Sequence, residues 1–179
     1  MAIWQFRLDL IPTSALRAKY GVVPVSIPQE QAENFPWWSE VQPPAGFEAR
    51  LDAILPKANS WSESMHIWGD ERGDTASVCY DNNRKVEWIG FRVDVRELSP
   101  GFVRDICRVS DELKCMLLTG AYHLIAPDEQ AVLAAINRST ARRYLEDPVT
   151  TLRSLKLSKG KIVRLPEETE ENGVPPKGE

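Results

Sequence analysis

Residues 64–97, SMHIWGDERGDTASVCYDNNRKVEWIGFRVDVRE, decide the fold. The segment contains three strand-like stretches, 65–69, 75–81 and 85–97. They are separated by Asp70-Glu71-Arg72-Gly73-Asp74 and by Asn82-Asn83-Arg84, which are rich in the residues that form tight turns. The sequence therefore predicts two consecutive hairpins, an antiparallel meander of three strands.

The third stretch has two different faces, because successive side chains of a strand point to opposite sides of the sheet. One face holds the apolar residues Ile89, Phe91, Val93 and Val95. The other face holds Trp88, Arg92, Asp94 and Arg96. A similar alternation over residues 3–10 predicts another half-buried strand, which ends at Pro12.

Helical spacing of apolar residues dominates the chain after this meander. Ser99 and Pro100 are typical of a helix start, and the spacing that follows predicts a helix to about residue 114. Other helices are expected at 14–20, 28–35, 45–55, 127–137, 139–146 and 147–155. Further strands are expected at 115–119 and 123–125.

These elements predict an α+β fold: a mainly antiparallel sheet of four or five strands with helices packed on one face. We expect residues 1–160 to form a single domain. Apolar periodicity is lost from Ser158 onward, so residues 161–179 are expected to be a flexible, disordered acidic tail.

Composition limits the class of protein. The chain has 179 residues, 42% of them hydrophobic, and its longest apolar runs are too short for a membrane span. The N-terminus lacks the pattern of a signal peptide. Three cysteines, Cys79, Cys107 and Cys115, form no C-x-x-C pair and favour buried thiols in a reducing compartment. We therefore expect a cytoplasmic protein, a monomer or homodimer when free, with no membrane contact.

The middle of the chain is acidic and rich in tryptophan. Residues 28–81 hold ten acidic against three basic residues, a net charge of −7, and four of the six tryptophans. Acidic charge speeds the encounter with a basic partner, and exposed aromatic side chains anchor it. The expected binding residues are Trp37, Trp38, Glu40, Trp61, Glu63, Trp68, Asp70, Glu71 and Asp74. In the alternative interpretation the tryptophans belong to the core and the acids only solvate the surface.

Catalytic groups are sparse in the sequence. His66 shares a strand face with Trp68, and a base at His66 could act with Asp94 on a neighbouring strand. Arg92, Asp94 and Arg96 form a charged stripe, either an anion clamp or a structural ladder of ion pairs. No nucleophile elbow, phosphate loop or metal-ligand spacing occurs, so no metal or cofactor is expected. The basic residues after 82 alternate with acids, which argues against nucleic-acid binding.

Three short sequence features carry a family resemblance over residues 61–155. They are Trp68-Gly69-Asp70 at a hairpin, the run from Phe91 to Arg96 before a helix, and Ser139-Thr140-Ala141 leading to Asp147-Pro148. The segment resembles the small immunity proteins encoded beside bacterial polymorphic toxins of contact-dependent and type VI secretion systems. The resemblance implies a cytoplasmic protein that occludes a cognate, basic toxin domain.

We therefore expect a non-enzymatic, protein-binding inhibitor. Two other hypotheses stay open. The first is a small hydrolase or transferase that uses His66 with Arg92, Asp94 and Arg96. The second is a homo-oligomeric accessory or structural protein whose own exposed tryptophans form the interface.

Overall fold

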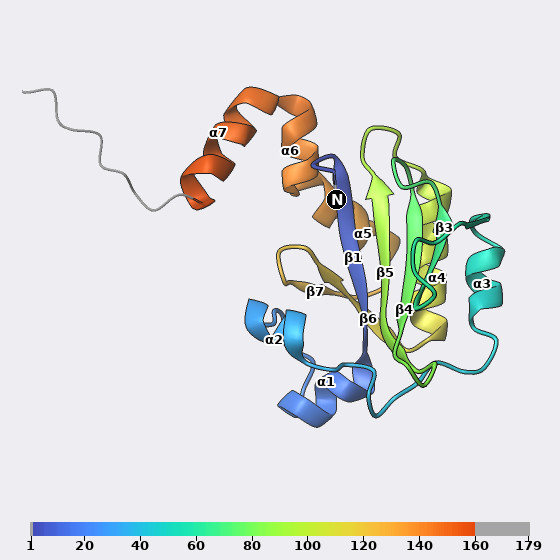
Figure 1. The fold of residues 1–179 in the computed structure, drawn as a ribbon. Coiled ribbons are helices and arrows are strands. Elements are labelled where there is room, and N and C mark those ends of the chain that lie inside the picture. Colours follow the sequence, from blue (N-terminus) through green and yellow to red (C-terminus); the bar gives the residue numbers. More distant parts are fainter. Residues whose placement is uncertain (1, 160–179) are drawn as a thin grey trace, which may run out of the picture.

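The computed structural model describes residues 2–159 and shows one antiparallel sheet of seven strands (Figure 1). In spatial order the strands are β2 (Lys57–Ala58), β3 (Met65–Gly69), β4 (Thr75–Tyr80), β5 (Val86–Asp94), β1 (Gln5–Pro12), β6 (Cys115–Thr119) and β7 (Leu124–Ile125). The α+β class and the antiparallel pairing are confirmed. The expected number of strands was wrong. Strand β2 was not predicted, because its two residues are too few to show an alternation, whereas β7 lies within the stretch expected at 123–125.

The meander predicted from residues 64–97 is present as β3, β4 and β5, which pair in the order of the sequence. His66 lies opposite Val78 on β4, and Val78 lies opposite Ile89 on β5. The first strand, β1, enters between β5 and β6 and pairs with both. A strand from the N-terminus therefore lies inside the sheet, next to its middle strand β5.

The helices begin and end close to the predicted signals. They are α1 (Thr13–Tyr20), α2 (Gln29–Asn34), α3 (Glu48–Asp52), α4 (Pro100–Glu112), α5 (Glu129–Asn137), α6 (Thr140–Glu146) and α7 (Pro148–Lys159). The Ser99 side chain accepts a hydrogen bond from the Phe102 N–H, the cap that the sequence predicts for α4. Helix α3 is shorter than the expected 45–55, because Phe47 and residues from Ala53 onward lie in turns outside it.

The two faces of the sheet differ in their cover. Helix α4 packs on the face that carries Phe91, and the Phe91 and Phe102 rings meet at 6.2 Å. The other face holds Arg7, Arg92 and Asp94, and no helix in the described part of the chain crosses it over β4 and β5 (Figure 1). The apolar core therefore lies between α4 and the sheet, as the alternation along β5 predicts.

The C-terminal region is described only in part. Helix α7 continues to Lys159, beyond the predicted end at 155. The expected acidic tail, 161–179, lies outside the described residues. The single-domain boundary at residue 160 therefore stays a prediction.

Candidate functional site

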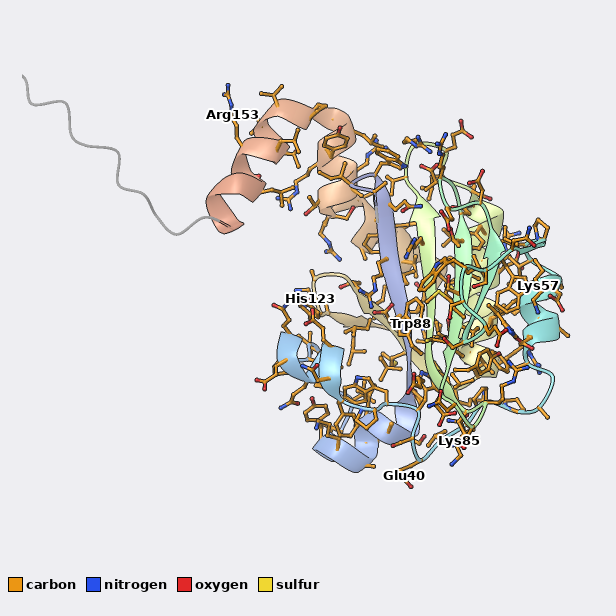
Figure 2. All side chains as sticks on the ribbon, viewed as in Figure 1. Glu40, Lys57, Lys85, Trp88, His123 and Arg153 are labelled. Atoms are coloured by element: carbon orange, nitrogen blue, oxygen red, sulfur yellow. The ribbon has the colours of Figure 1, made fainter. Side chains whose placement is uncertain are left out.

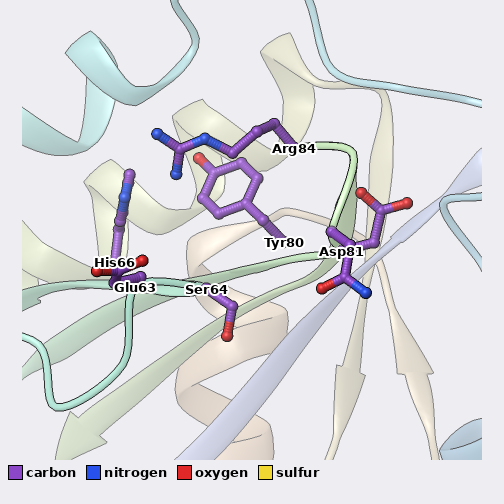
Figure 3. A pocket seen from close by; sticks show the side chains of 7 residues that line it. Glu63, Ser64, His66, Tyr80, Asp81 and Arg84 are labelled. Atoms are coloured by element: carbon purple, nitrogen blue, oxygen red, sulfur yellow. The ribbon is translucent and has the colours of Figure 1, made fainter.

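A hollow opens where β3 begins and β4 ends (Figure 3). Its volume is about 500 Å³. It is lined by Glu63, Ser64, His66, Tyr80, Asp81, Asn82 and Arg84. The two strands bring these side chains together because β3 and β4 are antiparallel, so the start of one lies beside the end of the other.

Glu48 of α3 contacts two residues that line this hollow, His66 and Tyr80. Its Oε1 lies 2.5 Å from His66 Nδ1 and accepts a hydrogen bond from the Tyr80 hydroxyl at 2.7 Å. A carboxylate only accepts hydrogen bonds, so the proton between Glu48 and His66 belongs to Nδ1 of the imidazole. The His66 and Tyr80 rings pack at 5.0 Å between centroids. Glu48 thus fixes the orientation of both rings.

The contacts around Glu48 change two pKa values in opposite directions, that of Glu48 and that of Tyr80. Burial alone would raise the pKa of Glu48, but the hydrogen bonds from His66 and Tyr80 outweigh it and lower this pKa. Burial and the neighbouring Glu48 carboxylate raise the pKa of Tyr80. At neutral pH Glu48 is therefore ionised, and a neutral Tyr80 donates a hydrogen bond to it.

Arg84 lies at the rim of the hollow. It is the last residue of the turn between β4 and β5, in which Arg84 N–H donates to the Asp81 carbonyl and Asp81 N–H to the Lys85 carbonyl. Its side chain extends beside the Tyr80 ring (Figure 3) and makes no hydrogen bond or ion pair with the described residues. The guanidinium is therefore free to meet a ligand or to be displaced by one.

Of the tryptophans in the acidic segment, only Trp61 is available for binding. It is 76% exposed and precedes Glu63, which lines the hollow, by two residues. Trp37, Trp38 and Trp68 are at most 5% exposed and belong to the core. The prediction that these three lie on a binding surface was wrong.

The buried tryptophans use their N–H groups inside the fold. Trp68 Nε1 donates to Asp52 at 2.6 Å, and Trp38 Nε1 donates to the Leu10 carbonyl at 3.2 Å. Trp37 Nε1 reaches the Ala32 carbonyl at 3.4 Å. Each indole has an apolar body and a satisfied polar atom, which explains why residues of this size can be buried.

Two aspartates at the other end of the β3–β4 hairpin accept main-chain hydrogen bonds. Asp70 Oδ1 accepts from the Arg72 N–H, and Asp74 Oδ1 accepts from the Asp94 N–H, both at 2.8 Å. The side chain of Glu71 is exposed there. The turn lies after the C-terminal end of β3, whereas Trp61 and Glu63 lie before its N-terminal end. The expected acidic residues are therefore at opposite ends of the strand and do not form one surface.

Glu40 lies at another place. It is exposed in the connection before α3 and is labelled at the same end of the molecule as Lys85 (Figure 2). Two hydrogen bonds between Gln42 and the main chain of Val86 hold this connection to the start of β5. The structure shows no contact that places Glu40 in the hollow.

The catalytic pairing of His66 with Asp94 was also wrong. His66 shares a face with Val78 and Ile89, whereas Asp94 lies on the opposite face of the sheet. Asp94 instead binds Arg96 through both carboxylate oxygens, at 2.6 Å for Arg96 Nη2. Arg92 lies directly opposite Arg7 and makes no ion pair among the described residues. The stripe is therefore not an assembled clamp.

The true partner of His66, Glu48, could not be found from sequence. Helix α3 precedes β3 by twelve residues of loop and short strand, and no periodicity fixes where it docks. The contact with Tyr80 was more accessible, because the predicted β3–β4 hairpin already places the end of β4 beside the start of β3.

Within residues 2–159, no cluster of three or more His, Cys, Asp or Glu side chains is arranged to hold a metal ion. The same part of the chain contains no helix long and apolar enough to cross a membrane. Cys107 and Cys115 are buried as expected, which raises their pKa to about 11 and about 12, while Cys79 is half-buried.

Comparison of the chain with protein-family models, with curated proteins and with solved structures finds no match. Geometry and chemistry of the hollow are therefore the basis for assigning a function.

Proposed function

We propose that this chain is a cytoplasmic, non-enzymatic protein-binding inhibitor, an immunity protein that blocks a basic bacterial toxin domain. The observation that carries the proposal is the exposed Trp61, two residues before Glu63 of the hollow. A tryptophan that is 76% exposed offers a large apolar surface that a partner can remove from water. Tryptophan is also among the residues that contribute most to protein–protein affinity.

The charge around Trp61 favours a basic partner. Glu63 and Asp81 line the hollow, and the ionised Glu48 contacts His66 and Tyr80 of its lining. Acidic charge at the rim of an interface mainly accelerates association and selects against acidic partners. Trp61 would supply the contact area, and the carboxylates would orient the partner.

The test is capture of a partner from the native host by the tagged full chain, followed by affinity measurement with variants. We expect Trp61→Ala to weaken binding by at least about tenfold, the usual loss at an interface hot spot. Glu63→Lys should slow association, most strongly at low salt.

Glu71→Lys is the matched control, because it reverses the charge of an exposed glutamate at the opposite end of the hairpin. It should leave the affinity within about twofold of the wild type. Equal losses from Glu63→Lys and Glu71→Lys would show a general charge effect and contradict the proposed surface.

A second candidate function rests on the Glu48–His66 contact of 2.5 Å. A carboxylate that holds Nδ1 leaves Nε2 to act as a general base in the hollow, the arrangement used by many hydrolases. If the protein is a hydrolase or transferase, His66→Gln abolishes turnover of its substrate while the fold is retained. If it is an inhibitor, no turnover is found with the wild type or with the variant.

A third possibility to distinguish from the inhibitor is a homo-oligomer that associates through Trp61. Light scattering of the wild type and of Trp61→Ala distinguishes it, since a homo-oligomer built on this side chain would dissociate in the variant. A wild-type monomer that binds its partner with one-to-one stoichiometry supports the inhibitor proposal.

A further inference from the structure

The hollow is chemically matched to a cation. Two carboxylates line it, those of Glu63 and Asp81, against the single guanidinium of Arg84. One Asp81 oxygen accepts from the main-chain N–H groups of Asn83 and Lys85. Behind the lining, the Glu48 carboxylate is hydrogen-bonded to His66 and Tyr80, so Glu48, Glu63, Asp81 and Arg84 together carry a formal net charge of −2. A concave site with one predominant sign of charge concentrates ions of the opposite sign.

Its walls fit the stem of a long basic side chain. The His66 and Tyr80 rings stand 5.0 Å apart at an angle of 59° and present aromatic surface to the hollow. Arginine and lysine lay their methylene groups along such surface and place the charged end where it is solvated or paired. A guanidinium is also attracted to the face of a tyrosine ring.

Arg84 already places one cation at this site. Its guanidinium lies close enough to Tyr80 to offset part of the rise in the pKa of that phenol (Figure 3). The side chain has no ion pair among residues 2–155, so no bond to a specific carboxylate holds it there. It can therefore leave the hollow without breaking an ion pair.

We propose that the hollow receives one arginine or lysine side chain of the partner, and that Arg84 occupies the rim of this site in the unbound protein. The inference rests on the proposed function and specifies the chemistry of the contact. Trp61 anchors the partner, and the incoming cation displaces Arg84 from its place beside Tyr80. Removal of Arg84 should accordingly open the site to a cation rather than destroy it.

The experiment uses the full chain and N-acetyl-arginine amide as the probe, with binding followed by amide chemical shifts in NMR. We expect shifts concentrated in residues 63–66 and 80–84. Arg84→Gly should bind the probe at least threefold more tightly than the wild type. Glu63→Gln should bind it more weakly.

Lys114→Gly is the matched control for Arg84→Gly. Lys114 also has a positive φ, 55° against 62° for Arg84, and its replacement also removes one positive charge. It lies between α4 and β6, three strands away from β4 in the sheet. The affinity of Lys114→Gly for the probe should equal that of the wild type.

Two outcomes would overturn the inference. One is unchanged or weaker probe binding by Arg84→Gly. The other is preferential binding of N-acetyl-glutamate amide, lost in Arg84→Gly, which would make Arg84 a ligand for an anion. The proposed function is tested separately: if the probe binds as expected while Trp61→Ala leaves partner affinity unchanged, the cation site stands and the Trp61 interface fails.

Discussion

The two ends of the β3–β4 hairpin hold similar residues and use them differently. At the turn end, Asp70 and Asp74 accept main-chain hydrogen bonds, and the nearby Trp68 is fully buried. At the other end, Trp61 is exposed and Glu63 lines a hollow. Acidic and aromatic composition alone therefore does not mark a binding surface. A residue is available to a partner only when the fold has not already satisfied it.

The largest expected difference between the two ends concerns their tryptophans. Trp68→Ala should lower the free energy of unfolding by about 3–5 kcal/mol, because it leaves a large cavity in the core. Trp61→Ala should change it by less than about 0.5 kcal/mol, as surface substitutions do. Urea denaturation of both variants measures the contrast. Comparable losses would mean that Trp61 packs against the protein in solution.

The next largest effect on stability is expected for a substitution of Gly69, at the turn end of the hairpin. Gly69 has φ 86°, and an added Cβ would lie 2.2 Å from the Asp74 carbonyl oxygen. Gly69→Ala should therefore destabilise the protein by about 2–3 kcal/mol, since both the conformation and the contact are unfavourable for alanine.

Gly73→Ala is the control in the same turn, because its nearest neighbour would be Asp70 Cβ at an ordinary 3.8 Å. Thermal unfolding of the pair measures the difference. A stable Gly69→Ala with an unstable Gly73→Ala would show that the turn adopts another conformation in solution.

The same contrast shows which features of the fold could be predicted from the sequence. The meander, the Ser99 cap of α4 and the apolar face of β5 follow from local periodicity and capping chemistry, which act within a few residues. The seven-stranded sheet does not, because β2 forms only when tertiary packing brings two residues beside the longer β3.

The candidate site shows the same limit. Glu63 and Trp61 were predicted to bind a partner, and both lie at or beside the hollow. Glu48 was missed because its contact with His66 joins a helix to a strand across 18 positions of the chain. The burial of Trp68 was missed because its hydrogen bond to Asp52 depends on how α3 docks. Neither contact leaves a periodic signal.

At the open end, Glu48 should make stability depend on pH. The folded state lowers the pKa of Glu48, so its contribution is complete above the unfolded pKa and is lost as the pH falls through the folded value. Glu48→Gln should therefore be less stable than the wild type at pH 7, by about 1 kcal/mol. The difference should shrink between about pH 5 and pH 3.

Urea denaturation of the wild type and of Glu48→Gln at pH 7, 5 and 3 measures this dependence. Asp70→Asn at the turn end is the comparison, since its carboxylate is exposed and accepts only the Arg72 N–H. A wild type and a Glu48→Gln variant that lose stability in parallel down to pH 3 would show that the contacts of Glu48 do not depend on its charge.

The smallest expected effect separates the backbone of Arg84 from its side chain. Arg84 and Lys114 have φ values of 62° and 55°, which disfavour residues with a Cβ. Substitution by glycine removes that strain but adds flexibility to the unfolded chain, so each variant should gain at most about 1 kcal/mol. Lys114→Gly measures this effect of the backbone alone, because the Lys114 side chain is exposed and its nearest acid, Asp111, is 4.0 Å away.

Arg84→Gly also removes a guanidinium from an acidic hollow, so its free energy of unfolding should rise less than that of Lys114→Gly. The difference in unfolding free energy between the two variants is then the stabilisation that the hollow gives to a cation, and equal gains would mean that the hollow gives none.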